Sequence, residues 1–532
     1  GVIGGLAAVP APLAAEWLTV PDESLVVARG SALDFSGLSA PGPAGVAGRV
    51  IVGASGALSF AQAPDRRARL NCASIAWSPA TGGFPDHRTA DLYAEQLRIH
   101  GYNLVRFHYV EATLMTDRKG DFDFDPEALD RFRYFLAALK RQGIYWVFDV
   151  LTSPNGARGD VFPHRWVEKH DLKLEVYVDD GARRHWRRLA ETLLGAVNPH
   201  TGIRPLDDPA LALVVLANEN GLEFLSLLQS RKTGQAYPDK LRPAFNAWLR
   251  KTYPNEGALK AAWGGLETGE SLGAGTVHFP RDRFDPGPRM RDKQRFFLDL
   301  EAETFGWMER ELRSLGYRGL VTSYNNWGST AADLTRGQLS VVARHGYFDE
   351  VLGYEPGESI TQRSSLDDEA GYVRSLAAAR WLGRPFVVTE YGHPFWNRFR
   401  REAGLVLPAY AALQGWDFVC RHAEGAIDLS TRQSAPRKRQ LTPYGIGLDP
   451  VARAGETLAA LLFHRGDVAP ARGVAAIPLG GERDLVDQGQ GDWPADLTTV
   501  GLMTKLGLVA PPAEASTGSP RLVLTPAASE PQ

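Results

Sequence analysis

Two glutamates in this chain directly follow apolar segments, and their placement points to acid–base chemistry. The apolar residues 211–216 lead to Glu219, and the apolar residues 385–388 lead to Glu390. Uninterrupted apolar runs of this length are typical of strands that are buried on both faces of a parallel sheet. Because catalytic side chains gather at the carboxyl ends of barrel strands, we expect both carboxyl groups to reach one site.

A pair of carboxyl groups suits the cleavage of an acetal near neutral pH. One group protonates the leaving oxygen, while a negative group on the opposite face of the sugar meets the developing oxocarbenium charge. If the two groups lie about 5 to 5.5 Å apart, the second attacks directly and the configuration is retained. A gap of about 6.5 to 9.5 Å admits a water molecule and inverts the configuration. The pair therefore predicts a glycosidase.

A larger scaffold must position these carboxyl groups, and the rest of the chain predicts one. From residue 70 onward, apolar strand-like runs alternate with amphipathic helix patterns, as in parallel βα units. We expect eight strands, at residues 70–77, 103–109, 144–150, 211–216, 319–324, 341–347, 385–390 and 414–419. A long helical insertion follows the fourth strand. The expected fold is therefore α/β, a (β/α)8 TIM barrel.

The compositional pattern divides the 532 residues into four parts, since the chain is long enough for a barrel with accessory modules. Residues 1–15 are rich in Ala, Gly and Pro, and we interpret them as a signal-peptide remnant, a tag or a linker. Residues 16–69 carry short alternating runs and predict a β-rich N-terminal module. The barrel occupies residues 70–463. Residues 464–532 predict a β-rich C-terminal module whose completeness stays open.

The composition also bears on the partners of the chain. It contains 59 Lys and Arg against 62 Asp and Glu, a net charge of -3, which gives no electrostatic argument for nucleic acid. No apolar stretch approaches the about 20 residues that a membrane span requires. No metal-ligand, P-loop or dinucleotide motif occurs. We therefore expect a neutral carbohydrate substrate, no membrane span, no metal and no cofactor.

The chain contains two cysteines, Cys72 and Cys420, which are too few for a disulfide framework. They fall on the first and eighth expected strands, which become neighbours when a barrel closes. We expect two buried free thiols rather than a bridge. Secretion or export to the periplasm is expected from the polysaccharide substrate and from the N-terminal segment, where Leu13-Ala14-Ala15 has the small residues of a signal-peptide end.

The residues at the expected strand ends resemble the active site of glycoside hydrolase clan A, the retaining (β/α)8 families. The resemblance covers roughly residues 70–463 and centres on Asn218-Glu219 after the fourth strand and Glu390 after the seventh. Further matching side chains are Arg106 and His108 on the second strand, His345 and Tyr347 on the sixth, and Trp416 on the eighth. This set is similar to family 5, the cellulase-like enzymes. The insertion after the fourth strand is more similar to family 42 and related β-galactosidases.

The resemblance implies a role for each central residue. Glu219 would be the general acid/base and Glu390 the nucleophile, with retention at a β-glycosidic bond. Arg106 would keep Glu390 ionised, and Tyr347 would orient it by donating a hydrogen bond. Asn218 would bond to the 2-hydroxyl group of the sugar, an interaction that strengthens in the transition state.

Other residues are candidates for contacts with the substrate. Trp416 would form the floor of the sugar site by stacking on the apolar face of the ring. His108 and His345 either bind the sugar or brace a carboxylate, and the sequence leaves both roles open. The weaker candidates for sugar subsites are Tyr324, Asn326 and Trp396.

An acidic run at residues 121–125 superficially suggests calcium ligands. It lacks the glycine and the distal glutamate of an EF-hand loop and leads directly into Pro126. We therefore expect Asp125 to cap a helix instead.

The sequence thus predicts a retaining hydrolase of β-glycosidic bonds in a neutral poly- or oligosaccharide. A transglycosylase that uses the same two glutamates is one alternative. A catalytically silent carbohydrate-binding barrel is another, although the Arg and Tyr that flank the two carboxyl groups argue against it. The oligomeric state stays open.

Overall fold

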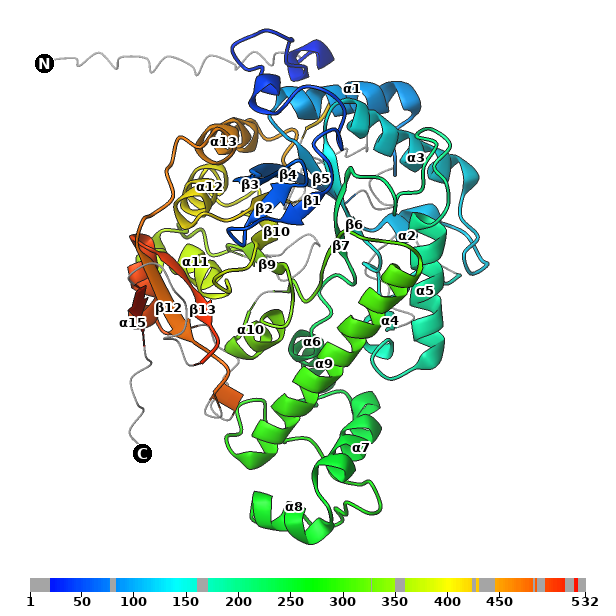
Figure 1. The fold of residues 1–532 in the computed structure, drawn as a ribbon, viewed down its shortest axis with the longest axis vertical. Coiled ribbons are helices and arrows are strands. Elements are labelled where there is room, and N and C mark those ends of the chain that lie inside the picture. Colours follow the sequence, from blue (N-terminus) through cyan, green and yellow to red (C-terminus); the bar gives the residue numbers. More distant parts are fainter. Residues whose placement is uncertain are drawn as a thin grey trace, which may run out of the picture.

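The computed structural model describes residues 20–76, 83–159, 171–326, 328–349, 359–422, 427–429, 445–481, 484–485, 493–511 and 521–524. Its centre is an eight-stranded sheet with the strand order β8-β7-β6-β5-β4-β11-β10-β9. All the pairings in this sheet are parallel. Helices surround the sheet (Figure 1). The predicted (β/α)8 barrel is confirmed.

The barrel strands are short and almost completely buried, as their apolar runs predict. They are β4 (Leu70–Ile75), β5 (Leu104–Phe107), β6 (Tyr145–Asp149), β7 (Leu211–Val215), β8 (Leu320–Thr322), β9 (Val342–Tyr347), β10 (Phe386–Gly392) and β11 (Phe418–Arg421). Two hydrogen bonds join the segments on either side of the β8–β9 gap, from Thr322 Oγ1 to Val341 O (2.8 Å) and from His345 N to Asn325 O (2.7 Å). The gap is therefore narrow, and the barrel is nearly closed.

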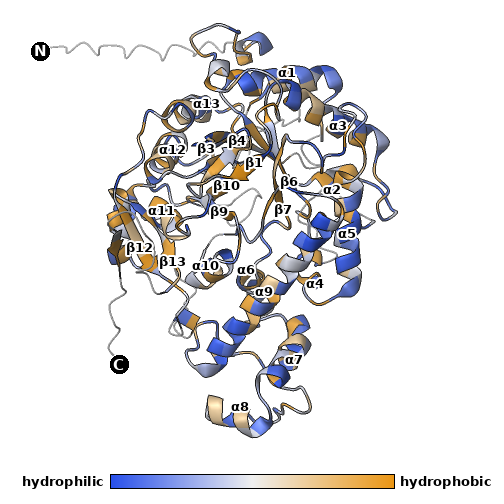
Figure 2. Cartoon of the chain, viewed as in Figure 1, coloured by the Kyte–Doolittle hydropathy of each residue, from blue (hydrophilic) through white to orange (hydrophobic). Residues whose placement is uncertain are grey.

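The helices lie on the outside of the barrel. They are α1 (His87–Ile99), α2 (Val110–Leu114), α3 (Pro126–Arg141), α4 (Leu172–Glu175), α5 (Asp180–Leu194), α6 (Leu222–Thr233), α7 (Arg242–Thr252), α8 (Glu256–Trp263), α9 (Pro288–Ser314), α10 (Thr330–Arg336), α11 (Asp367–Ala378), α12 (Glu402–Gln414) and α13 (Pro450–Ala459). In Figure 1, α7 and α8 lie below the barrel, and α9 runs from the barrel towards them. Figure 2 shows hydrophobic residues on the central strands and hydrophilic residues along much of α5. No described helix is long and apolar enough to cross a membrane.

The eighth strand begins later than the sequence predicts. The expected strand covered residues 414–419, whereas β11 starts at Phe418. The reason is Gly415, which has a φ of 66° and ends α12 in the left-handed conformation. A residue with that backbone conformation cannot continue as a strand, so the strand begins only after the helix cap.

The two cysteines close the barrel covalently. Cys72 on β4 and Cys420 on β11 are register partners, as expected for neighbouring first and last strands, and their Cα atoms are 4.3 Å apart. They form a disulfide. The expectation of two free thiols is therefore wrong, because it lacked the register that places the two side chains side by side.

The N-terminal residues form a small sheet against the amino-terminal end of the barrel. Strands β1 (Val50–Val52), β2 (Leu58–Phe60) and β3 (Ala63–Arg67) are antiparallel. Leu58 N donates to Asp417 Oδ1 (2.9 Å), just before β11, and the Phe60 ring packs on Tyr145 at the start of β6. This sheet therefore covers the face opposite the predicted site.

A second small sheet packs against α11 and α12 on the outside of the barrel (Figure 1). It contains β12 (Val474–Pro478), β13 (Lys505–Val509) and β14 (Arg521–Val523), all parallel, in the order β13-β12-β14. The side chain of Gln414, at the end of α12, donates to Gly501 O and accepts from Leu506 N. Apolar side chains of β12 and β13 share one core with α11 and α12, so this sheet extends the barrel's packing.

The disulfide generates a prediction about stability. A cross-link between the first and last barrel strands reduces the entropy of the unfolded chain, so Cys72→Ala/Cys420→Ala should lower the free energy of unfolding by about 2 to 4 kcal/mol. The measurement is thermal or denaturant unfolding of both proteins with and without reductant. Reductant should lower the stability of the wild type alone. Two titratable thiols in the denatured, unreduced wild type would contradict the bridge.

Candidate active site

Glu219 and Glu390 meet at the carboxyl ends of the barrel strands, as predicted. Glu219 follows β7, and Glu390 lies near the end of β10 after an irregularity in its pairing with β9. One carboxylate oxygen of each glutamate and one ring nitrogen of His345 all lie within 4.8 Å of one another. The side chain of Glu390 is only 5% exposed, whereas that of Glu219 is 20% exposed. Glu219 is thus the more accessible of the pair.

Both oxygens of the Glu390 carboxylate are held by hydrogen bonds. Arg106 Nη1 donates to Oε1 at 2.6 Å, and the hydroxyl of Tyr347 donates to Oε2. His108 Nε2 lies 3.7 Å from Oε1, and His422 Nδ1 lies 3.7 Å from Oε2. The carboxylate is therefore fixed in one orientation by hydrogen-bond donors from β5 and β9.

Arg106 connects four strand ends through a single buried guanidinium group. Its Nε and Nη2 atoms donate to the two carboxylate oxygens of Asp149 at 3.1 and 2.5 Å. Nη1 also donates to Thr389 O at 3.0 Å, and Nη2 donates to Asn218 Oδ1 at 2.8 Å. Because Arg106 occupies the amide oxygen of Asn218, the Asn218 amide nitrogen is left to donate elsewhere.

The charge of Glu390 is favoured by its surroundings. Burial by itself raises the pKa of Glu390, but the positive charges of His345, His422, Arg106 and His108 outweigh burial and hold that pKa well below its usual range. Burial lowers the pKa of His108, and Arg106 lowers it further. Of these neighbours, Arg106 is the one that stays charged at every relevant pH, since its pKa is raised by Asp149 and Glu390 despite its burial.

Glu219 is held by a different set of contacts. Its Oε1 lies 2.9 Å from His345 Nδ1, and its backbone N–H donates to Asn325 Oδ1 at 2.9 Å. Glu219 has a φ of 49°, a left-handed conformation that is strained for a residue with a side chain. Asn325 also donates to Thr389 Oγ1 at 3.2 Å, so it links the strained backbone to β10. His345 contacts both glutamates, with Nδ1 3.5 Å from Glu390 Oε2.

Four strand ends share this left-handed conformation. The residues are Tyr109 after β5, Glu219 after β7, Tyr324 after β8 and Asp349 after β9, with φ values of 59°, 49°, 53° and 57°. Strained backbone of this kind costs roughly 1 to 3 kcal/mol per residue and concentrates at functional sites. The repetition of this strain at the carboxyl ends indicates that this face of the barrel is a functional site, because the strain lowers the stability of the fold.

Lys173 brings a further positive charge to this face. The short helix α4 is anchored by Leu172 N, which donates to Pro154 O (3.0 Å), and by the hydroxyl of Tyr177, which donates to Asn220 O (2.7 Å). Lys173 is 9% exposed, and burial lowers its pKa while the charges of Glu219, Glu111 and Glu390 oppose that shift. No hydrogen bond or ion pair joins its ammonium group to any other described residue.

Two of the expected substrate contacts are wrong. Trp416 precedes β11 and packs against Phe386 and Tyr410 in the core beside the outer helices, at the end of the strand opposite the site. It cannot form the floor of a sugar site there. Tyr324 points into the helical layer, where its hydroxyl donates to Glu301 O (2.7 Å).

The remaining candidates are placed differently. Asn326 Oδ1 accepts from Gly221 N at 3.3 Å, so Asn326 braces the loop that follows Glu219. The ring of Trp396 is 51% exposed beside Phe395, and its role as a platform stays a prediction. The histidines contact carboxylates, since His108 Nδ1 lies 2.8 Å from Asp149 Oδ2 and His345 lies between the two glutamates.

Sequence reasoning missed His422 and Lys173 and did not predict the pairing of Asp149 with Arg106. His422 follows β11, and its Nδ1 lies 3.2 Å from Ser74 Oγ. The eighth strand was predicted to end at residue 419, so His422 was not expected at a strand end. Lys173 lies on a helix of only four residues, too short to show periodicity. Asp149 is the last residue of β6, and its pairing with Arg106 depends on the side-by-side arrangement of β5 and β6. Correct register would have indicated His422 and Asp149.

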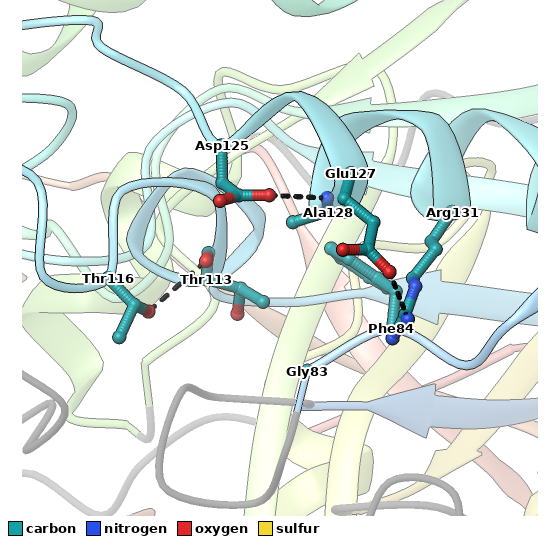
Figure 3. Close-up of a pocket in the computed structure, with 8 residues that line it drawn as sticks. All are labelled: Gly83, Phe84, Thr113, Thr116, Asp125, Glu127, Ala128 and Arg131. Carbon is teal, nitrogen blue, oxygen red and sulfur yellow. Dashed lines mark hydrogen bonds and ion pairs between the residues drawn. The ribbon is translucent and has the colours of Figure 1, made fainter.

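A separate pocket of about 250 Å³ lies at the start of α3, where the acidic run ends (Figure 3). Asp125 Oδ1 accepts from Ala128 N at 2.8 Å, which confirms that Asp125 caps α3. Glu127 pairs with Arg131 one turn further along the helix. The pocket contains neither of the central glutamates and is not part of the site.

The donors at the strand ends would also fit a divalent cation, because Glu219, His345 and Glu390 offer three ligand atoms. Arg106 and the adjacent histidines already satisfy Glu390, however, and a cation would have to displace those contacts. The arrangement fits a pair of working carboxyl groups better than a metal site.

No protein-family model and no curated protein matches the amino-acid sequence. Solved structures do match the fold. The cold-adapted β-galactosidase from Rahnella sp. R3 superposes with a TM-score of 0.55 at 15% identity, covering 84% of this chain and 65% of that one. The β-galactosidase from the psychrophilic Marinomonas ef1 gives 0.53 at 16% identity, covering 84% and 70%. That from Bacillus circulans sp. alkalophilus gives 0.53 at 14% identity, covering 84% and 65%.

These similarities establish the fold, a barrel shared with glycoside hydrolases. The chain spans less than two thirds of the Rahnella and Bacillus proteins, which are therefore longer at one or more places. Glu219 follows the fourth barrel strand, β7, and Glu390 lies near the end of the seventh, β10.

Two buried carboxyl groups behind the site generate a prediction about pH. Burial raises the pKa of Glu301, whose carboxylate accepts from Leu222 N (2.6 Å) and Thr335, to about 7. Between about pH 4.5 and 7 the folded protein holds a proton there that the unfolded chain releases, so stability falls as the pH rises through 7. Burial raises the pKa of Glu111, which accepts from Thr152 N and Ser153 N, to about 7 in the same way.

Glu301→Gln should therefore weaken this pH dependence by roughly 3 kcal/mol between pH 5 and pH 8. The measurement is the free energy of unfolding across that range for the wild type and the variant. Glu309→Gln, at a half-buried position on the same helix where Glu309 pairs with Arg313, is the control and should keep the dependence of the wild type. An unchanged pH profile in Glu301→Gln would refute the shifted pKa.

Proposed function

We propose that this protein is a retaining glycoside hydrolase that cleaves β-glycosidic bonds in a neutral poly- or oligosaccharide. The observation that carries the proposal is the approach of a Glu219 carboxylate oxygen to within 4.8 Å of one from Glu390 at the carboxyl ends of β7 and β10. An oxygen–oxygen distance of no more than 4.8 Å favours direct attack, because a site that admits a water molecule holds its carboxyl groups about 6.5 to 9.5 Å apart. It supports retention of configuration.

In the first step, a carboxylate oxygen of Glu390 attacks the anomeric carbon. The bond from that carbon to the leaving oxygen breaks, and Glu219 transfers its proton to the leaving oxygen. The low pKa of Glu390 keeps the nucleophile ionised, and Arg106 and Tyr347 orient it by hydrogen bonds. The product of this step is a glycosyl ester on Glu390.

In the second step, Glu219 takes a proton from water while the water oxygen attacks the anomeric carbon and releases Glu390. Glu219 is the more exposed of the two carboxyl groups. This suits its role, because the general acid/base must contact both the leaving group and the attacking water. Arg106 bonds to the amide oxygen of Asn218, so the amide nitrogen of Asn218 is assigned as the donor to the 2-hydroxyl of the sugar.

Lys173 is assigned to substrate binding on the Glu219 side. Its ammonium donors lack a described partner, and Tyr177 fixes its helix beside Asn220. A buried ammonium group that gains hydroxyl acceptors from a sugar recovers hydrogen bonds it lost on burial. It would bind the substrate equally before and during the reaction.

We also propose that the protein is secreted or periplasmic. The Cys72–Cys420 disulfide supports this, because such bridges persist in oxidising compartments.

The test of the two glutamates is a screen of β-linked aryl glycosides and polysaccharides with wild type, Glu390→Gln and Glu219→Gln. Each substitution should lower hydrolysis by about 10²-fold or more, because each removes a group that acts in the transition state. Azide should rescue Glu219→Gln and yield a β-glycosyl azide. Glu309→Gln is the matched control. Full activity in either site variant, or an α-configured azide product, would refute the mechanism.

Lys173→Met tests the substrate contact. Loss of a charged donor should lower kcat/KM by at least about tenfold, mostly through KM, because the contact exists before the transition state. Lys251→Met on the distant helix α7 is the control and should match the wild type. A fall in kcat with an unchanged KM would instead place Lys173 in the chemical step.

A further inference from the structure

A second group of potential ligands lies on the outside of the barrel, away from the site. His87 is the first residue of α1, Asp130 lies on α3, and His200 lies in the loop between α5 and β7. Asp130 uses both carboxylate oxygens, since His87 Nε2 lies 2.7 Å from Oδ2 and His200 Nε2 lies 2.8 Å from Oδ1. One ligand atom from each residue lies within 4.8 Å of the other two.

These three side chains are held in place by contacts outside the cluster. The His87 ring stacks on Tyr134, with centroids 3.7 Å apart and an interplanar angle of 6°. His200 N donates to Asn198 Oδ1 (2.9 Å), and Asn198 Nδ2 donates to Arg133 O on α3 (2.9 Å). Figure 1 shows α1 and α3 side by side, and their buried faces meet through the rings of Tyr93 and Phe135. The cluster is thus preorganised by three separate segments.

We propose that His87, Asp130 and His200 bind one Zn²⁺ ion. Two imidazole nitrogens and one carboxylate oxygen are a donor set that Zn²⁺ takes, with a water molecule in the fourth position. The exposed sides of the His87 and Asp130 side chains, 45% and 47% accessible, leave room for that water. Ligand atoms around a tetrahedral Zn²⁺ lie about 3.3 Å apart. Metal binding would draw the three ligand atoms, which lie within 4.8 Å of one another, to this spacing.

The metal would replace the two hydrogen bonds of Asp130 with coordination bonds. Each imidazole would bind through Nε2 in the neutral form that carries its proton on Nδ1, so a ring that was protonated before binding releases one proton. The ion would join the start of α1 to α3 and to the loop that delivers β7, the strand before Asn218 and Glu219. Its expected effect is stabilisation of that face rather than a part in the chemistry.

The proposal is tested by titrating chelator-treated full-length protein with ZnCl₂ in a calorimeter. The wild type should bind one equivalent, and its melting temperature should rise with Zn²⁺. His87→Gln, His200→Gln and Asp130→Asn should each weaken that binding by at least about tenfold and abolish the thermal shift. His278→Gln, at an exposed histidine elsewhere, is the matched control and should bind as the wild type does.

A second comparison separates this site from the central glutamates, which also offer ligand atoms. Glu390→Gln should keep the Zn²⁺ isotherm and lose hydrolysis, whereas His200→Gln should keep hydrolysis and lose the isotherm. Circular dichroism establishes that each variant is folded. The proposal is overturned if the wild type takes up no Zn²⁺, or if uptake is lost in Glu390→Gln and retained in the three cluster variants.

Discussion

The site depends on the burial of one guanidinium group. Arg106 is fully buried. Its charge is compensated by the carboxylates of Asp149 and Glu390, and its remaining donors bond to the oxygen atoms of Thr389 and Asn218. Removing one partner from such a network leaves an uncompensated buried charge, which costs on the order of 3 to 5 kcal/mol. The ends of four strands are therefore obliged to stay in register around Arg106. The same contacts keep one glutamate ionised and occupy the amide oxygen of Asn218.

The second glutamate is controlled by backbone strain rather than by a strong ion pair. Glu219 is held in a left-handed conformation by Asn325, which also bonds to Thr389 on β10. Polar side chains behind it, such as Glu301 and Asn326, brace the loop that follows. The two glutamates thus differ in environment, since Glu390 is enclosed by donors and Glu219 faces the opening. Different environments allow two chemically identical groups to perform different tasks.

The parts outside the site close and cover the barrel. The disulfide joins the first and last strands, the N-terminal sheet covers the amino-terminal face, and the C-terminal sheet extends the core around α11 and α12. All three lie away from the carboxyl ends of the strands. This division is physically reasonable, because the strained and charged end of the barrel contributes little stability and the rest of the molecule must supply it.

The sequence by itself determined the barrel, its eight strands and the two glutamates. Apolar runs and helical periodicity are local, and the parallel direction of the strands is enough to bring Glu219 and Glu390 to one end. Only the tertiary structure decided which side chains surround them. Strand register brings Asp149 and His422 to the site, and the docking of α4 brings Lys173 there. Trp416 lies outside the site because α12 ends at Gly415 and β11 begins only after it. The Cys72–Cys420 bridge likewise required the register. Strand register and the docking of helices depend on contacts between residues far apart in the chain, which local pattern does not encode.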